Sequence, residues 1–411
     1  MAKQQFDLII SGGGATGWSV VLALLAQLPV APQGDKLKVA LIDSFDSNKI
    51  NPHPGFDARA LALSQQSLRY FQQMNIADVI KKSGTAIHRI HVSDRGAAGQ
   101  VVLDHQSYQE QELGIVMEAQ QLGAILLNAA ESQLAQSPYI DFLRLQPDRI
   151  IKADTHRNQV QIETDGGHSL ETKLLVLAEG STSQSRQWFN MDTHVNEYQQ
   201  HAIITNVVTE NSPDNTAFER FTAAGPLAFL PMTEQRSGVV WSVDSADVER
   251  VMAMSDDDFL SALQTQFGCR LGKLVKTGKR QAYPLKLITT DDAVCHRVVC
   301  VGNASQTLHP IAGQGFNLAL RDAWQLAAHV SRCKNNNEDA GSFRLLSALK
   351  QARKKDQQQT IQLTDSLVHL FSNNNPLLTA GRNAGLLLMN NFSVLKDNFA
   401  RVAMGQQSGT E

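Results

Sequence analysis

The chain lacks the features that mark membrane-spanning, secreted and nucleic-acid-binding proteins. None of its apolar runs approaches the roughly 18 residues that a membrane span requires, and residues 1–7 lead into no signal-peptide apolar region. The formal net charge of -3 provides no electrostatic field for nucleic acid. The 4 cysteines form no C-x-x-C pair and no metal-ligand spacing, which argues against structural zinc and fits a reducing compartment. We therefore expect a cytoplasmic protein with no metal site and no nucleic-acid partner.

The chain does have length for two or three domains and, late in the sequence, a strand–loop–helix pattern. The β-branched run at 298–301 predicts a buried strand, and the apolar spacing at 318–328 predicts a helix. Between them, residues 302–317 form what we call the second glycine loop, in which Gly313 and Gly315 let a flat ring approach the backbone. The helix start favours an anion, such as a reduced isoalloxazine. An ordinary connection with a few glycines is the alternative interpretation.

The first glycine loop, residues 12–17, stands at the other end of the chain. It contains the G-x-G-x-x-G pattern of Gly12, Gly14 and Gly17, follows an apolar strand at 7–10 and opens a helical stretch at 18–28. In dinucleotide-binding folds the first glycine permits a tight turn, the second admits the pyrophosphate, and the third allows close packing of helix and strand. Strand, glycines and helix agree, which favours a dinucleotide site over glycines retained for packing alone.

A carboxylate suited to the adenosine ribose follows the next predicted strand. That strand spans 38–42 and ends at Asp43, which lies farther from the glycines than is usual because a polar insert occupies 29–36. No second G-x-G-x-x-G stands between a strand and a helix elsewhere in the sequence. An enzyme that holds two dinucleotides would need two such sites, so one resident FAD is the economical inference.

Two further charged motifs lie in the middle of the chain. The stretch 53–63 places Arg59 between a turn and a helix, where it could approach the flavin side chain or pyrophosphate; a surface salt bridge is the alternative. The predicted strand at 174–178 ends in Glu179-Gly180, at the edge where open α/β sheets bind ligands. Residues 198–282 alternate strands with turns, which predicts an antiparallel sheet forming an apolar wall over the flavin.

The C-terminal part, from about residue 341, is predicted to be helical. An apolar stripe there consists of Leu363, Leu367, Leu370 and Phe371. A basic cluster precedes it, formed by Lys350, Arg353, Lys354 and Lys355. Most such clusters are solvated helix faces, and contact with anionic lipid or a partner is the alternative.

Taken in order, these motifs resemble those of the aromatic-hydroxylating flavoprotein monooxygenases, whose fold is like that of para-hydroxybenzoate hydroxylase. The closer likeness is to the ubiquinone-biosynthesis hydroxylases, and among them to those that act on polyprenyl methoxyphenols. Besides the glycine loops, it rests on the stretches 53–57, 92–96, 217–221 and 364–371, so it spans nearly the whole chain.

The resemblance implies an α/β (α+β) fold with a Rossmann-like FAD-binding domain, an inserted antiparallel-sheet substrate domain and a helical C-terminus. The FAD-binding domain would be discontinuous and would comprise residues 1–75, 98–185 and 283–345. The inserted substrate domain would comprise residues 76–97 and 186–282, and the helical C-terminal region residues 346–411.

The implied reaction is hydroxylation of the ring of a polyprenyl (methoxy)phenol in ubiquinone biosynthesis. FAD, reduced by NAD(P)H or another electron donor, would react with dioxygen to a C4a-hydroperoxide that transfers one oxygen. The lipid-embedded substrate implies peripheral contact with the inner membrane or with other ubiquinone-biosynthesis proteins. An isoprenoid-reductase-like flavoenzyme on the same fold and a non-catalytic FAD-binding scaffold are the alternatives.

Motifs and resemblance together nominate a set of site residues. The expected FAD contacts are Gly12, Gly14, Thr16, Gly17, Asp43, Arg59, Glu179, Gly302, Asn303, Gly313, Gly315, Phe316 and Asn317, with backbone N–H groups of Gly315 and Phe316 facing the flavin C2 carbonyl and N1. Pro310 would border the reactive edge of the ring. His309 is the candidate for proton transfer because it is the only titratable residue of its loop, and a histidine hydrogen-bonded within a turn is the alternative.

Two positions depart from the wider family. Glu179-Gly180 stands where Asp-Gly is usual. Gly302-Asn303 stands where Gly-Asp is usual, with Gln306 where a histidine is common. Because asparagine still offers a hydrogen-bond acceptor to the ribityl hydroxyls, we expect FAD binding to survive.

Overall fold

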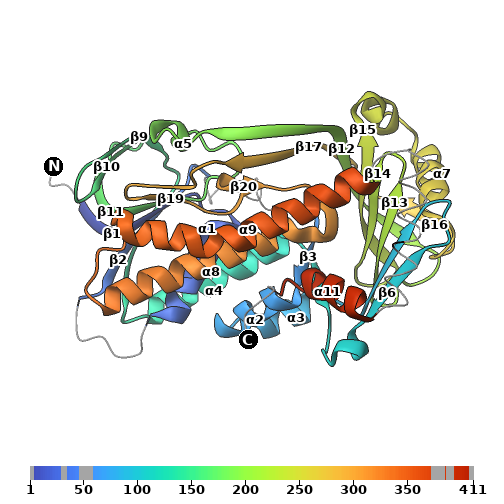
Figure 1. Cartoon of the computed structure of the whole chain (residues 1–411), viewed down its shortest axis with the longest axis horizontal. Coiled ribbons are helices and arrows are strands. Elements are labelled where there is room, and N and C mark those ends of the chain that lie inside the picture. Colours follow the sequence, from blue (N-terminus) through green and yellow to red (C-terminus); the bar gives the residue numbers. More distant parts are fainter. Residues whose placement is uncertain (1–3, 29–34, 46–58, 372–384, 386–392, 407–411) are drawn as a thin grey trace.

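Two β-sheets lie at opposite ends of the molecule, and two long paired strands run from one to the other (Figure 1). The computed structural model describes residues 4–28, 35–45, 59–371, 385 and 393–406. No helix in these ranges is long and apolar enough to cross a membrane. The predicted motif at 53–57 lies outside the described residues.

The first sheet has eight strands around a parallel core in the order β19-β11-β1-β2-β8. These strands are β1 (Gln4–Ser11), β2 (Leu37–Ile42), β8 (Ile140–Leu145), β11 (Ser169–Leu177) and β19 (Val298–Cys300). Three strands extend it in antiparallel pairing: β9 (Ile150–Thr155), β10 (Val160–Thr164) and β18 (Val294–Cys295). Because β1, β2, β11 and β19 are parallel, the residues that follow them meet at one edge of the sheet.

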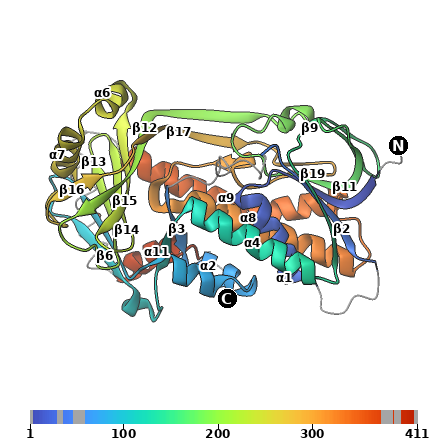
Figure 2. The same ribbon diagram turned by 180° about the vertical axis from the view of Figure 1, so that it is seen from behind.

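Helices cover one face of this sheet, as Figure 2 shows from behind. They are α1 (Ala15–Gln27), α4 (Ala119–Gln136) and α8 (Gln314–Asn335), and α1 packs against both others. Apolar strand residues such as Leu8, Ile10 and Leu41 form one core with Leu22 and Leu320 of the helices. The first and second glycine loops therefore begin neighbouring helices, although nearly three hundred residues separate them.

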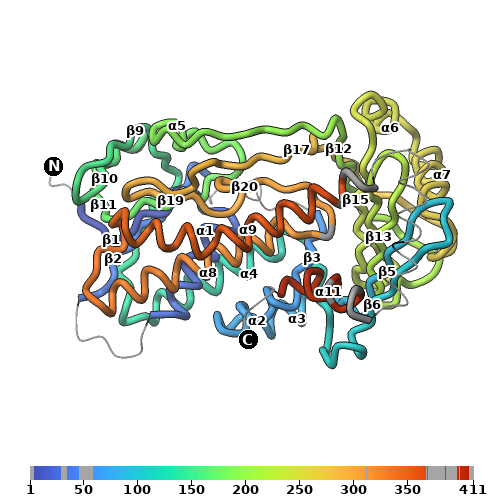
Figure 3. The backbone as a smooth tube through the Cα atoms, in the orientation of Figure 1, coloured from blue at the N-terminus to red at the C-terminus, as the bar shows by residue number. Residues whose placement is uncertain are grey.

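The second sheet has nine strands and forms the other end of the molecule. Its order is β20-β17-β12-β15-β14-β13-β5-β6, with β16 beside β12. The strands are β5 (Arg89–Asp94), β6 (Gln100–Asp104), β12 (Thr193–Thr209), β13 (Thr216–Thr222), β14 (Gly225–Pro231), β15 (Arg236–Asp244), β16 (Leu274–Thr277), β17 (Gln281–Thr290) and β20 (Gln306–Thr307). The strands β12 and β17 pair over most of their length and link the two sheets (Figure 3).

One face of the second sheet packs against helix α7 (Asp256–Phe267), next to the short α6 (Val248–Met252). Phe229 stacks on Phe267 with a ring-centroid distance of 3.8 Å, and Trp241 packs against Phe259 at 5.8 Å. The opposite face, which we call the inner face, is turned toward the first sheet and lines a cavity. The antiparallel pairing predicted for residues 198–282 is confirmed in β12, β14 and β15.

A small third sheet corrects the prediction at Arg59. Residues 60–64 form strand β3 (Ala60–Ser64), not a helix, and β3 pairs with β7 (Gly114–Glu118), which also pairs with β4 (Thr85–Ile87). The antiparallel ladder overrides the helix propensity of an Ala-Leu-Ala-Leu run. Helix α2 (Gln65–Gln73) begins only after Ser64, whose side chain accepts the N–H of Ser67, and α3 (Ala77–Ser83) follows.

Strand pairing also bears on the proposed domain limits. Because β6 pairs with β5 in the second sheet, a limit at residue 98 divides a hairpin, and a limit after Asp104 keeps the hairpin whole. The strand β17 likewise crosses the limit at 283.

The C-terminal region begins with α9 (Phe343–Phe371), which contacts β18 of the first sheet and β14 of the second. The prediction that its basic cluster is a solvated face is wrong for Arg353, which is 2 % exposed and paired with Asp322. Lys350 pairs with Asp292. The side chains of Leu367, Leu370 and Phe371 lie outside the described residues. Helix α11 (Ser393–Ala403) packs near β6.

Candidate active site

A cavity of about 1380 Å³ connects both glycine loops to the inner face of the second sheet. One end is formed where β1, β2 and β11 finish and where α1 and α8 begin. Most nominated residues line it: Gly12, Gly14, Thr16, Asp43, Arg59, Glu179, Asn303, Pro310, Gly313, Gly315, Phe316 and Asn317. Gly17, Gly302 and His309 are buried and do not line it.

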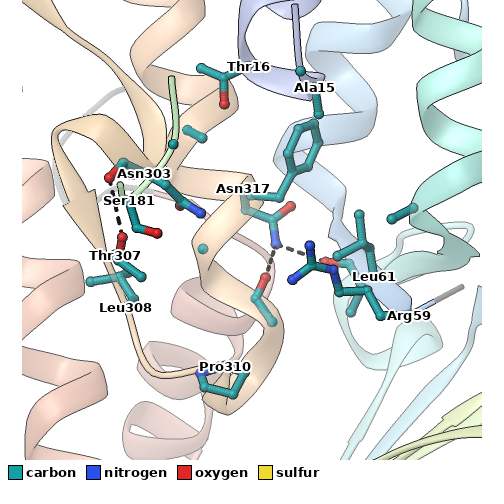
Figure 4. Close-up of a pocket in the computed structure, with 18 of the residues that line it drawn as sticks. Ala15, Thr16, Arg59, Leu61, Ser181, Asn303, Thr307, Leu308, Pro310 and Asn317 are labelled. Carbon is teal, nitrogen blue, oxygen red and sulfur yellow. Dashed lines mark hydrogen bonds between the residues drawn. The ribbon is translucent and has the colours of Figure 1, made fainter. Parts of the chain in front are cut away.

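The two glycine loops touch each other. Gly302 has a left-handed backbone (φ +60°), and a Cβ at this position would lie 2.6 Å from Oγ1 of Thr16. Gly17 is packed more tightly, since its Cβ would lie 1.9 Å from the carbonyl oxygen of Gly12. Figure 4 shows Thr16 and Asn303 on the same side of the cavity. The two ends of the chain therefore build one site, as the idea of a single resident FAD requires.

The start of α1 offers backbone N–H groups to an anion. Gly12 has a φ of +112°, and a Cβ there would lie 2.5 Å from the carbonyl oxygen of Ala178, so only glycine fits this turn. Gly14 precedes the helix, and no described side chain caps it. Because Gly14, Ala15 and Thr16 line the cavity, the helix start fits a pyrophosphate.

The start of α8 is open in the same way. Gly313 takes the left-handed conformation (φ 63°) just before the helix, and no described side chain caps it. A Cβ on Gly315, which lines the cavity, would meet no atom outside its own helical turn within 4 Å. The backbone there is thus exposed to a ligand that comes close, which fits a flat flavin ring whose anionic edge faces the positive end of the helix.

Asn317 fixes this loop with its whole side-chain amide. Its Oδ1 accepts the N–H of Ser64 at 2.9 Å and the hydroxyl of Ser67 at 2.7 Å. Its Nδ2 donates to the carbonyl oxygens of Ala62 at 2.9 Å and Gly313 at 2.8 Å (Figure 4). Since all four bonds are made within the protein, the side chain positions the loop on β3 and α2, and the amide group is not available to the cofactor.

Gln306, which stands where a histidine is common in the wider family, belongs to a buried hydrogen-bond network. Its Nε2 donates to Oδ2 of Asp322 at 2.8 Å, and Oδ1 of Asp322 accepts from Nε of Arg353 at 3.0 Å. Gln357 adds a bond to the same Oδ1 at 3.1 Å. This buried network joins the second glycine loop, α8 and α9. Asn303, by contrast, is exposed at the cavity, where its amide can face a ligand.

Glu179 is surrounded by hydroxyl groups. Its carboxylate accepts from Oγ of Ser11 at 2.5 Å and from Ser183 and Ser185 at 2.7 Å each. The neighbouring Arg186 donates to the carbonyl oxygens of Ser181 at 2.7 Å and of Ala304 at 3.0 Å. The Glu179 loop is thereby tied to the second glycine loop, a positioning role for Arg186 that its sequence motif alone did not reveal.

Asp43 and Arg59 both line the cavity. Asp43 is buried, its Oδ2 accepts the N–H of Gly13, and its Oδ1 accepts the N–H of Phe45 at 2.7 Å. This carboxylate therefore stabilises the first glycine loop itself. The guanidinium of Arg59 lies 5.7 Å from the ring centroid of Tyr283, and Figure 4 shows it beside Leu61 and Asn317.

His309 has the geometry of a histidine fixed in a turn. It is 1 % exposed, and its Nδ1 accepts the N–H of Ile311 at 3.2 Å. Its Nε2 has no partner among the described residues, and its ring is nearly perpendicular to that of Tyr198, at a centroid distance of 5.3 Å. Burial lowers the pKa of His309 to about 4, so the imidazole is neutral at pH 7.

One residue of the cavity was missed by the motif search. Glu219 on β13 lines the inner face, and burial raises its pKa to about 7. The signal was present in the sequence, because Ala217 and Phe221 flank it at the strand period of two. A carboxyl group that faces an apolar cavity is costly unless a hydrogen-bond or charge partner satisfies it.

Comparisons with known proteins agree with this architecture. The family described as FAD binding domain matches residues 5–364. The ubiquinone hydroxylase UbiL of Rhodospirillum rubrum is 30% identical over 406 residues, covering 98% of this chain and 90% of that protein. The 3-demethoxyubiquinol 3-hydroxylase of Escherichia coli is 27% identical and covers 98% of this chain and 100% of its own length.

The fold itself is shared with solved flavoprotein monooxygenases. The p-nitrophenol 4-monooxygenase PnpA of Pseudomonas putida superimposes with a TM-score of 0.76 over 99% of this chain and 100% of that chain, at 15% identity. The predicted fold class is thus confirmed. The family match and the relationship to UbiL show that the chain belongs to the FAD-binding-domain family, in the group of ubiquinone-biosynthesis hydroxylases.

Proposed function

We propose that this protein is an FAD-dependent monooxygenase that hydroxylates the aromatic ring of a polyprenyl methoxyphenol in ubiquinone biosynthesis. The observation that carries the proposal is the cavity that joins the glycine loops to an apolar sheet face. The hydroxylases of ubiquinone biosynthesis among its relatives support the same conclusion. The oxygen atom that the ring receives comes from dioxygen. FAD, reduced by NAD(P)H or another electron donor, would activate that dioxygen when it is bound.

The FAD end of the cavity gives each part of the cofactor a matching surface. The first glycine loop and the start of α1 bind the pyrophosphate through backbone N–H groups. The start of α8, at Gly315 and Phe316, would hold the flavin ring at its C2 carbonyl and N1, where the helix dipole would stabilise negative charge. Asn303 offers its amide to the ribityl hydroxyls, and Arg59 adds a fixed positive charge beside the cofactor.

The other end of the cavity suits a hydrophobic substrate. Apolar side chains such as Ile90, Ala202 and Val240 line it from three strands of the second sheet. The polyprenyl tail would lie along this face, and the aromatic head would point toward Pro310 and Ile311, which line the cavity. The protein holds the ring in place and keeps water out, both of which favour oxygen transfer over decay of reduced flavin.

The substrate also bears on where the enzyme works. A long polyprenyl tail keeps the phenol in lipid, so the enzyme meets it at a membrane surface or receives it from another protein of the pathway. We place the reaction at the cytoplasmic side of the inner membrane, through peripheral contact.

Oxygen consumption tests the proposal. The purified protein, loaded with FAD and supplied with NADPH or NADH, should consume dioxygen only when a short-chain 2-prenyl-6-methoxyphenol is present, and the product should contain one more oxygen atom. Deleting the gene should cause the unhydroxylated quinone precursor to accumulate. A protein that stays colourless after FAD is added would indicate a scaffold, and reduction of prenyl double bonds without oxygen consumption would indicate an isoprenoid reductase.

A further inference from the structure

The inner face of the second sheet is apolar except at one carboxyl group. Among the described residues that line the cavity from β5, β6 and β12 to β15, Glu219 is the only one that ionises. Its neighbours on this face are Val92, Ala217, Phe221, Ala228 and Leu230. A carboxyl group in such surroundings is costly unless something pairs with it.

Strand register fixes the direction in which Glu219 points. It lies opposite Ala228 of β14 and Val92 of β5, and all three line the cavity. The side chains of the adjacent residues of β13 reach the other face: the ring of Phe218, which also borders the cavity, packs against Phe267 at a centroid distance of 5.5 Å, and Nε of Arg220 donates to the carbonyl oxygen of Gln266 at 2.9 Å. Arg220 is therefore turned away from the carboxylate of Glu219.

No described residue pairs with this carboxylate. Burial alone accounts for the raised pKa of Glu219, with no hydrogen bond and no charge contributing. The side chains that face it from β5 and β14 are apolar. Elsewhere on the cavity wall the cationic groups are Arg59, which contacts the ring of Tyr283, and Arg149, which pairs with Asp165. The carboxyl groups at the FAD end, in Glu179 and Asp43, are bonded within the protein.

We propose that Glu219 is a catalytic residue, which binds the phenolic hydroxyl of the substrate and accepts its proton. This inference rests on the proposed function. The O–H bond of the phenol breaks, the proton moves to a carboxylate oxygen of Glu219, and the bonding electron pair stays on the ring oxygen. The resulting phenolate raises the electron density of the ring carbons ortho and para to it, which makes them better acceptors of an electrophilic oxygen. The step needs no oxidant or reductant.

The acid–base match favours this role. A phenol has a pKa near 10 and an ordinary glutamate a pKa near 4.3, so an ordinary carboxylate is a weak base toward a phenol. Burial raises the pKa of Glu219 to about 7, which brings it closer to the pKa of the phenol and makes the carboxylate a stronger base. The site should also prefer a free phenol to its O-methylated analogue, since only the free phenol can donate to the carboxylate.

The test compares Glu219→Gln with Glu197→Gln in the full-length, FAD-loaded protein. Gln keeps the shape and a hydrogen-bonding oxygen but is not a base. Glu197 is the matched control because it lies on β12 of the same sheet, outside the cavity, in a surface pair with Lys286. FAD absorbance and FAD affinity should equal those of the wild type in both variants, which shows that the fold and the FAD end are intact.

Two further readouts decide the role of Glu219, with a short-chain 2-prenyl-6-methoxyphenol as the probe. In wild type and control, kcat should rise with pH as Glu219 ionises near pH 7, a step that Glu219→Gln should lack. At pH 7 the kcat of Glu219→Gln should fall on the order of 100-fold and recover partly as rising pH ionises the phenol directly.

The inference is overturned if Glu219→Gln turns the probe over at the rate and with the pH dependence of the wild type, while the wild type hydroxylates it. If the wild type binds FAD but neither binds nor hydroxylates the probe, the proposed function fails, and the role of Glu219 fails with it.

Discussion

The two ends of the cavity differ in how their polar groups are satisfied. At the FAD end, Asn317 makes four hydrogen bonds within the protein and Glu179 accepts three from serines. On the inner face of the second sheet, the one carboxyl group, Glu219, has no partner among the described residues. The FAD end is thus a rigid, internally bonded surface, whereas the substrate end is apolar and leaves its polar group to a ligand.

This difference matches the chemistry of the two ligands. A resident cofactor is bound by preformed backbone N–H groups, whose loops must be fixed in advance. A flexible prenyl tail needs apolar area more than directed bonds. Mutations of the internally bonded residues at the FAD end should therefore reduce stability and FAD binding together, while mutations on the inner face should change turnover without loss of fold.

The largest effect is expected for Asp322→Asn. Asp322 and Arg353 are each 2 % exposed and form a 2.8 Å ion pair, so the variant leaves a buried guanidinium without its counter-charge. The free energy of unfolding should fall by about 3–5 kcal/mol, measured by urea denaturation, and FAD should dissociate more readily. The control Asp104→Asn, which breaks an exposed pair with Arg89, should cost no more than about 1 kcal/mol. Equal losses in the two variants would contradict the network.

A smaller loss is expected for Asn317→Ala, because Ser64 N–H and the carbonyl oxygens of Ala62 and Gly313 lose their partner. Stability should fall by about 1–3 kcal/mol. The matched variant Asn303→Ala removes an exposed amide at the cavity, so thermal denaturation should show little change while FAD affinity falls. If both asparagines changed only stability, Asn303 would not contact the cofactor.

Gly315→Ala should lower FAD affinity without lowering the stability of the protein. The new methyl group meets no atom outside its own helical turn within 4 Å, so stability should change by no more than about 0.5 kcal/mol, yet FAD affinity should fall at least about tenfold. Gly302 has a φ of +60° and lies close to Thr16, so Gly302→Ala should strain the backbone. This variant should lower stability by about 1–3 kcal/mol and should also lower FAD affinity. Unchanged FAD affinity in Gly315→Ala, measured by fluorescence titration, would place the flavin elsewhere.

The smallest effect at neutral pH is expected for His309→Gln. Burial lowers the pKa of His309 from 6.5 to about 4, so the unfolded chain binds a proton between these values that the folded chain does not. The wild type should lose stability as pH falls from 6.5 toward 4, by up to about 3 kcal/mol from this group, and not above 6.5. The variant should lose this part of the slope while the pH profile of hydroxylation stays unchanged. A changed profile would restore His309 as a proton-transfer group.

Local patterns predicted much of the fold and of the FAD end. The first and second glycine loops were found because strand, glycine and helix follow one another within a few residues. The prediction failed at residues 60–64, where β7 supplies the hydrogen bonds of a strand that its own composition did not indicate.

Long-range pairing explains what the sequence did not reveal. Asp322 and Arg353 are 31 residues apart, and neither stands in a recognisable motif, so a buried ion pair between them is invisible before the helices are packed. The role of Asn317 was predicted as cofactor contact, because nothing in the sequence shows that β3 lies within reach of its amide. Glu219 was missed although its strand spacing indicates an inward acid, and its lack of a partner appears only in three dimensions.

The central claim is that both ends of the chain bind a single FAD whose ring faces an apolar cavity. An experimental structure of the FAD-loaded protein tests it most directly. We predict one FAD per chain, with the pyrophosphate at the start of α1, the flavin ring at the start of α8 and the reactive edge open to the inner face. A flavin bound away from these helix starts, or a different ligand in the cavity, would contradict the account.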